Sequence, residues 1–247
     1  MGRTNQEADL TDDRLFDGRL VCRQHRHGYR FSLDAVLLAH FITPRSDDRI
    51  IDLGTGCGIV SLILAYRWPD ITITALELQP ELAALALENV IANGLEDRVR
   101  VVAGDFADPG RLIAAGAFDW AVSNPPYRKI ESGRRNPGRQ QAMARHEISG
   151  NLGMVIRAAK YGVRTRGRAA FIFPAARGAE LITRLKNNNM EPKRLQVVAN
   201  HPGAEGKLLL VEAVHGGGEE LAILPPLHVY QAPGGEYSEE MARYYAP

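Results

Sequence analysis

The chain has 247 residues, of which 45% are apolar and 24% charged, and its formal net charge is +1. This composition excludes a disordered or fibrous protein and is typical of a globular chain with a substantial core. The near-neutral charge also excludes a uniformly basic protein, so a surface that binds nucleic acid would have to arise from local clusters. Residues 1–16 lack the apolar segment of a signal peptide, and no run of about 18 apolar residues occurs, so we expect a soluble cytoplasmic protein.

The N-terminal region is predicted to hold little regular structure. Residues 1–14 are polar and acid-rich and are expected to be disordered, whereas residues 15–24 alternate enough for a short strand or hairpin. We expect one domain over residues 15–247. Cys22 and Cys57 lie far apart in the sequence, which predicts no disulfide framework and fits a reducing compartment.

Strands and helices are expected to alternate through the middle of the chain. Apolar periodicity and turn residues predict strands at 49–52, 71–77, 98–102, 118–123 and 169–173, and helices at 34–42, 58–68, 80–93, 111–115 and 150–163. Such alternation predicts an α/β fold with a doubly wound, mostly parallel sheet that helices cover on both faces.

The C-terminal part departs from this alternation. After a helix over 176–187, two strands at 194–199 and 208–215 are joined by the short link 200–203. A link of this length cannot make a parallel crossover, so the two strands should be antiparallel. Seven strands that end in an antiparallel hairpin are the arrangement of class I methyltransferases, a Rossmann-like fold that plain dinucleotide-binding domains do not share.

A glycine-rich loop follows the first expected sheet strand. It reads Asp52-Leu53-Gly54-Thr55-Gly56-Cys57-Gly58. In an open α/β sheet the ligand lies beyond the carboxyl ends of the strands, and Gly54, Gly56 and Gly58 would let the backbone approach it closely. A dinucleotide-binding loop is the alternative, but its Gly-x-Gly-x-x-Gly spacing differs from the Asp-x-Gly-x-Gly-x-Gly run here, which resembles the S-adenosylmethionine motif.

Carboxylates after the next two strands complete the predicted cofactor site. Glu77 ends the second strand, where it could accept both ribose hydroxyls, and Leu78 follows it. Asp105 and Phe106 follow the third strand and offer a carboxylate for an adenine amino group and a ring beside the base. Core packing is the alternative role of Phe106, and Cys57 is expected to be a small filler rather than a nucleophile.

The tetrapeptide Asn124-Pro125-Pro126-Tyr127 follows the fourth strand, across the switch point from the glycine loop. An exocyclic amine or a carboxamide is a poor nucleophile, because its lone pair is delocalised. The Asn124 oxygen and the Pro125 carbonyl could accept its two N–H groups and aim the lone pair at a methyl group. Pro126 would fix the backbone and Tyr127 could stack on the planar substrate.

An Asn-Pro-Pro turn can also be ordinary loop punctuation. Here it occurs in order with the glycine loop, Glu77 and Asp105 on successive strands. The combination predicts an S-adenosylmethionine-dependent enzyme that methylates a planar nitrogen, and it counts Asn124 among the cofactor contacts as well. We expect no metal ion and no membrane contact.

A basic loop follows the tetrapeptide. Its positive residues are Arg128, Lys129, Arg134, Arg135, Arg139 and Arg145, against Glu131 alone between positions 128 and 145, and Arg157, Lys160, Arg164, Arg166 and Arg168 follow in the next helix and its exit. A solvated surface is the alternative. Its place beside the predicted catalytic residues favours contacts with RNA phosphates. The target amine would have to be single-stranded or flipped out, as bases in RNA loops are.

Segments along nearly the whole chain resemble the bacterial tRNA(Val) adenine-N6 methyltransferase family. They are residues 29–38, 52–58, 124–127, 144–147 and 234–237. The resemblance implies N6-methylation of adenine 37, which lies 3′ to the anticodon, in a valine tRNA. It also implies that Ser32 and Asp34 lie over the cofactor, and that Arg145, His146 and Glu147 order the loop around the substrate, although His146 could equally be a structural hydrogen-bonding residue.

Three other functions remain open on the residues alone. A protein glutamine-N5 methyltransferase acting on a release factor shares the tetrapeptide, but such enzymes usually have an N-terminal helical substrate-binding domain. A guanine-N2 RNA methyltransferase is the second. The third is a non-catalytic module that binds RNA or senses S-adenosylmethionine, and an intact Asn-Pro-Pro-Tyr argues against it because binding alone would not need those acceptors.

Overall fold

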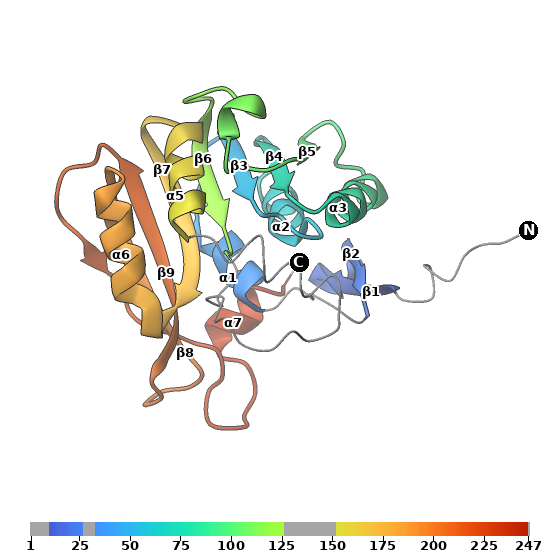
Figure 1. The fold of residues 1–247 in the computed structure, drawn as a ribbon. Helices are drawn as coiled ribbons and strands as arrows, with labels where there is room; N and C mark the ends of the chain where they lie inside the picture. Colours follow the sequence, from blue (N-terminus) through green and yellow to red (C-terminus); the bar gives the residue numbers. More distant parts are fainter. Residues whose placement is uncertain (1–9, 27–32, 126–151, 247) are drawn as a thin grey trace, which may run out of the picture.

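The computed structural model describes residues 10–26, 33–125 and 152–246 (Figure 1). Its centre is a nine-stranded sheet. The seven longer strands of that sheet are β3 (Arg49–Leu53), β4 (Thr72–Glu77), β5 (Val99–Ala103), β6 (Phe118–Ser123), β7 (Val163–Pro174), β8 (Met190–Ala199) and β9 (Gly206–His215). The two-residue strands β10 (Ala222–Ile223) and β11 (Leu227–His228) both pair with β8.

The strand order confirms the predicted doubly wound arrangement. The seven longer strands lie in the order β8-β9-β7-β6-β3-β4-β5. Neighbours from β5 to β7 are parallel, and β9 is antiparallel to both β7 and β8. The predicted antiparallel hairpin is therefore β8 and β9. The sequence did not predict β10 and β11, because two residues are too short to show a period.

Helices cover both faces of this sheet, and two apolar clusters fill the space beneath them. One cluster lies under α1 (Leu33–Phe41), α2 (Ile59–Arg67) and α3 (Pro80–Ala92), and the other under α5 (Leu152–Gly162) and α6 (Gly178–Asn187), which lie in front of the sheet in Figure 1. Successive residues of β3 alternate between the clusters, with Ile50 in the first and Ile51 in the second. The expected helix at 111–115 is instead the 3₁₀ turn η3 (Pro109–Arg111).

An N-terminal hairpin packs beside this sheet. Strands β1 (Leu10–Leu15) and β2 (Leu20–His25) pair across the turn η2 (Phe16–Gly18), so the disorder expected through residue 14 ends before β1. The polar residues misled that expectation, because β1 pairs by its backbone and buries Leu15 at its end. Residues 1–9 lie outside the described part.

Two asparagines of α3 hold this hairpin. Asn93 Oδ1 accepts from the Val21 backbone N–H (2.9 Å), and Asn93 Nδ2 donates to the Val21 carbonyl (2.7 Å). Asn89 makes the same two bonds with the backbone of Arg23 at 2.8 Å each. The carboxamides thus take the place of a neighbouring strand along β2 and satisfy its edge.

The C-terminal segment packs onto α1. The short helix α7 (Glu239–Arg243) is followed by Tyr244, whose ring stacks on His40 at 4.3 Å between centroids. Burial, followed by the charge of Arg67, lowers the pKa of His40 to about 4, so this imidazole is neutral in the stack at neutral pH. Within the described ranges, no helix is long and apolar enough to cross a membrane.

Candidate active site

The predicted cofactor loop and catalytic residues meet at one edge of the sheet. Strand β3 pairs with β4 on one side and with β6 on the other, and all three are parallel. Their carboxyl ends therefore lie side by side, and this is the switch point where ligands bind in such sheets. The glycine loop leaves β3 at this point, and Asn124 follows β6.

The glycine loop has a backbone that side chains would strain. Gly54, Gly56 and Gly58 have φ values of 76°, 62° and 91°. A Cβ on Gly58 would also lie 3.3 Å from the Cβ of Ala86, whereas a Cβ on Gly54 would meet nothing within 4 Å. The loop is thus packed against α3 at Gly58 and open at Gly54, which leaves room for a ligand above its first turn.

Asp52 supports this loop from inside the protein. Its side chain is 1% exposed, and its Oδ2 accepts hydrogen bonds from Thr55 Oγ1 (2.6 Å) and Ser61 Oγ (2.8 Å). Burial raises the pKa of Asp52 to about 6, although the two hydroxyls oppose that shift. Asp52 therefore joins the loop to the first turn of α2, and its predicted contact with the cofactor stays a prediction.

Glu77 connects the carboxyl end of β4 to the same loop. Its side chain is buried, with Oε2 accepting the Gly56 backbone N–H (2.8 Å) and Oε1 accepting that of Gln79 (2.9 Å). Burial raises the pKa of Glu77, and the backbone N–H groups oppose this shift. Each carboxylate oxygen keeps a second lone pair, so the group fits the ribose diol that the sequence assigned to it. The contact itself, and that of Leu78, stay predictions.

The residues after β5 divide into a loop carboxylate and a core ring. Asp105 Oδ1 accepts the Ala107 backbone N–H (2.8 Å), and the residue before it, Gly104, donates its N–H to the Glu77 carbonyl (2.8 Å). Phe106 is 7% exposed and packs with Leu76 and others in the core. Core packing, the alternative role for Phe106, is thus present, while its stacking on a base and the Asp105 contact stay predictions.

The catalytic segment is fastened to the cofactor loop. Ser123 Oγ donates to the Leu53 carbonyl (2.7 Å), which holds the end of β6 against the start of the glycine loop. Asn124 is half-buried and Pro125 is buried directly after it. The other predicted catalytic and substrate residues lie outside the described residues: Pro126, Tyr127, Arg128, Lys129, Arg134, Arg135, Arg139, Arg145 and His146, as does Ser32 of the cofactor set. Asp34 lies in the first turn of α1.

The sequence did not reveal that Cys22 and Cys57 are neighbours. Their Sγ atoms lie 3.7 Å apart in the interior, although both are free thiols. Asn89 Nδ2 also donates to the Cys57 carbonyl (2.8 Å), so one carboxamide ties hairpin, α3 and glycine loop together. The hydrogen bond with Cys57 and burial raise the pKa of Cys22, which keeps that thiol protonated. The pairing of Asn89 and Asn93, four residues apart on one helix face, was the available signal.

The second group of basic residues does not extend the predicted RNA surface. Arg164 stands at the start of β7, at the edge opposite the glycine loop, and its Nε donates to Asp119 Oδ1 (2.6 Å). Arg168 and Arg194 both pair with the buried Glu212. These three arginines are ion-paired within the protein, so their part in the RNA interpretation was wrong.

The fold and the site define a class I methyltransferase. In the part of the chain that the structure describes, no group of three or more His, Cys, Asp or Glu could hold a metal ion. The Methyltransferase small domain family model matches residues 32–164. A computed likeness of the whole fold agrees: the predicted O-methyltransferase Atu636 from Agrobacterium tumefaciens has a TM-score of 0.71 at 21% identity over 86% of this chain and 95% of that one.

Curated relatives narrow the family. The tRNA1(Val) (adenine(37)-N6)-methyltransferase of Porphyromonas gingivalis W83 is 36% identical over 189 residues, which are 74% of this chain and 73% of the relative. The protein of the same name from Bacteroides thetaiotaomicron is 31% identical over 86% of this chain and 88% of its own. The chain belongs to this methyltransferase family. It is an enzyme, and its cofactor is S-adenosylmethionine.

Proposed function

We propose that this enzyme methylates N6 of adenine 37, next to the anticodon of a valine tRNA. The observation that carries the proposal is the fastening of Ser123 to Leu53, which sets Asn124 beside the cofactor loop. Family membership supports the choice of base, because relatives of this chain are named for that reaction.

The cofactor half of the site binds and orients. Glu77, held by the N–H groups of Gly56 and Gln79, would accept the ribose hydroxyls, and the open backbone at Gly54 would take the adjoining part of the ligand. When bound, S-adenosylmethionine supplies a methyl group on a positively charged sulfur. The buried Asp52 keeps the loop in place without touching that sulfur.

The substrate half prepares the nitrogen. The Asn124 side-chain oxygen and the Pro125 carbonyl would accept the two N6–H groups, which withdraws the lone pair from the ring and aims it at the methyl carbon. The lone pair forms the new N–C bond while the C–S bond breaks, and the cationic amine then loses a proton to solvent. No strong general base is required.

The target base must leave its stack to reach Asn124. An adenine in the anticodon loop is unpaired, so its extrusion costs less than that of a duplex base. The predicted phosphate contacts of the basic segment 128–145 would hold the loop beside the site. We further propose that the enzyme acts in the cytoplasm, where free thiols such as Cys22 and Cys57 stay reduced.

Transfer of a labelled methyl group tests the proposal. Wild-type enzyme should label an unmodified valine tRNA transcript, and nucleoside digestion should place the label in N6-methyladenosine. A transcript with guanine at position 37 is the matched control and should stay unlabelled. Label on a release factor instead would favour the glutamine-N5 function, and label in N2-methylguanosine would favour the guanine-N2 function.

A further inference from the structure

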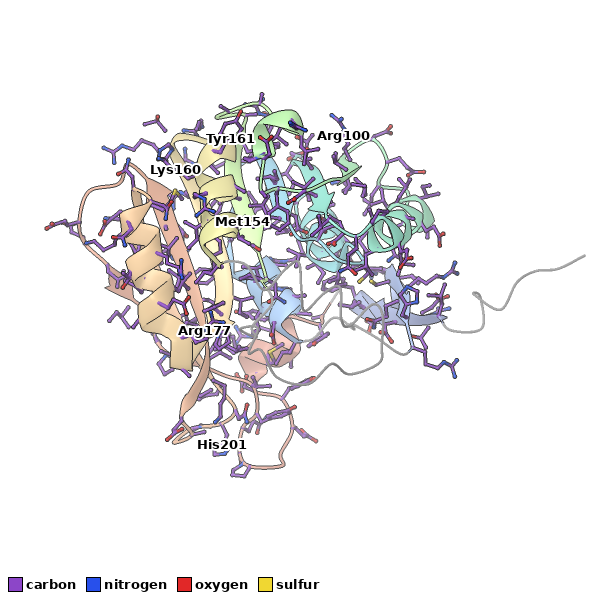
Figure 2. All side chains as sticks on the ribbon, in the orientation of Figure 1. Arg100, Met154, Lys160, Tyr161, Arg177 and His201 are labelled. Carbon is purple, nitrogen blue, oxygen red and sulfur yellow. The ribbon has the colours of Figure 1, made fainter. Side chains whose placement is uncertain are left out.

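Arg177 stands next to the catalytic segment on the side away from the cofactor loop. Strand β7 is the parallel neighbour of β6, and Ser123 lies opposite Phe171. Strand β7 ends at Pro174, and the 3₁₀ turn η4 (Ala175–Arg177) follows at the same edge of the sheet as Asn124. Figure 2 shows Arg177 near this end of the sheet, while Lys160 and Tyr161 lie at the other.

The guanidinium of Arg177 is held in a defined orientation. Its Cζ lies 4.7 Å from the centroid of the buried Phe173 ring. Its Nε donates to Glu180 Oε2 (3.0 Å), and its Nη2 lies 2.9 Å from the same oxygen. Only 23% of the side chain is exposed. Because these contacts restrict its rotamers, little further entropy would be lost when it binds a ligand.

This arginine belongs to a cluster with excess positive charge. Glu180 also accepts from Arg184 Nε through its other oxygen, at 3.0 Å. Partial burial opposes it, but the hydrogen bonds and charges of Arg177 and Arg184 together lower the pKa of Glu180, which is therefore ionised at neutral pH. Two guanidinium groups thus share one carboxylate. The excess of one positive charge favours an anion near the catalytic edge.

We propose that Arg177 binds a backbone phosphate of the RNA strand beside the reacting adenine. A phosphodiester suits a guanidinium that is already stacked on a ring, because the planar fork bonds phosphate oxygens at its edge. Arg184 stands further along α6 and is 42% exposed, and we assign it no RNA contact. The inference rests on the proposed function, because it requires RNA to be the substrate.

A pair of single substitutions tests this role. Arg177→Ala and Arg184→Ala each remove one ion pair with Glu180, so they are matched in what they do to the protein itself. Binding of an anticodon stem-loop RNA is measured by fluorescence anisotropy across a series of salt concentrations. Arg177→Ala should weaken binding roughly tenfold. It should also reduce the slope of log Kd against log salt by about 0.7, the value for one phosphate of a single strand. Arg184→Ala should leave both unchanged.

Two further readouts separate a phosphate contact from a structural role. Arg177→Lys keeps the charge but loses the fork, so its salt slope should match the wild type while its affinity falls. Affinity for S-adenosylmethionine should be the same in all variants. Equal effects of the two alanine variants, or an unchanged slope in Arg177→Ala, would overturn the proposal. So would loss of cofactor affinity in Arg177→Ala, which would assign the guanidinium to the cofactor's carboxylate.

The wild-type protein distinguishes this proposal from the proposed function. If the wild type binds and methylates RNA but the Arg177 and Arg184 variants behave alike, only the phosphate contact fails. If the wild type neither binds nor methylates any RNA, the proposed function fails and the phosphate contact fails with it. Thermal unfolding of each variant shows whether a loss of binding follows from a loss of folded protein.

Discussion

The two halves of the catalytic edge are built differently. On the cofactor half, the buried carboxylates Asp52 and Glu77 are bonded to hydroxyl and backbone groups of the glycine loop. On the substrate half, the end of β6 is held by one hydroxyl, and the nearby charge belongs to Arg177 and its partners. The cofactor half is thus part of the folded interior, whereas the substrate half presents groups for a ligand. Substitutions in the two halves should therefore affect different measurements.

The largest effect is expected for Asn124→Ala. This change removes an acceptor for the N6–H groups, so kcat should fall by roughly 10²–10³-fold, as for other groups that act mainly in the transition state. The dissociation constant for S-adenosylmethionine, measured by calorimetry, should change little. A parallel loss of cofactor affinity would make Asn124 a cofactor ligand and would remove the contrast between the two halves.

Glu77→Gln should produce the reverse pattern. The neutral amide cannot accept both ribose hydroxyls and the backbone N–H groups as a carboxylate does, so cofactor affinity should fall roughly 10–100-fold. RNA binding should be retained. Glu88→Gln is the control, because Glu88 is exposed on α3 and its nearest cation, Arg23, is 3.9 Å away. If Glu77→Gln leaves cofactor affinity intact, the ribose assignment is wrong.

Asp52→Asn should change how stability depends on pH. The pKa of Asp52 is about 6 in the folded protein against an ordinary 3.8, so folding favours its protonated form. Its contribution is fully present below about pH 4 and is lost as the pH rises through 6. The wild type should therefore lose about 3 kcal/mol over this window relative to Asp52→Asn. Urea unfolding at several pH values measures this, and two parallel stability curves would contradict it.

The smallest effects are expected in the hairpin contacts. Asn89→Ala and Asn93→Ala each remove two bonds to the backbone of β2, and each should destabilise the protein by about 1–3 kcal/mol. Only Asn89 also bonds the Cys57 carbonyl, so only Asn89→Ala should weaken cofactor binding, by a few-fold. Equal cofactor affinities in the two variants would show that the hairpin does not influence the glycine loop.

The sequence predicted the parts of the molecule that depend on local patterns. Buried strands such as β6 (Phe118–Ser123) were placed correctly because their apolar runs end at turn residues. The glycine loop was recognised because its spacing reflects backbone conformations that other residues avoid.

What the sequence did not predict depends on contacts between distant residues. The proximity of Cys22 and Cys57 arises from how the hairpin packs on α3. The ion pairs of Arg164 and Arg168 arise from strand pairing, so a count of charges along the chain could not separate them from a substrate surface. Arg177 was missed because its value lies in Phe173 and Glu180 around it.

The most direct test of the central claim is nucleoside mass spectrometry of purified valine tRNA from cells with and without this protein. We predict that N6-methyladenosine at position 37 is present in the first sample, disappears in the second and returns when the wild-type protein, but not Asn124→Ala, is restored. An unchanged level of N6-methyladenosine in cells that lack the protein would contradict the claim.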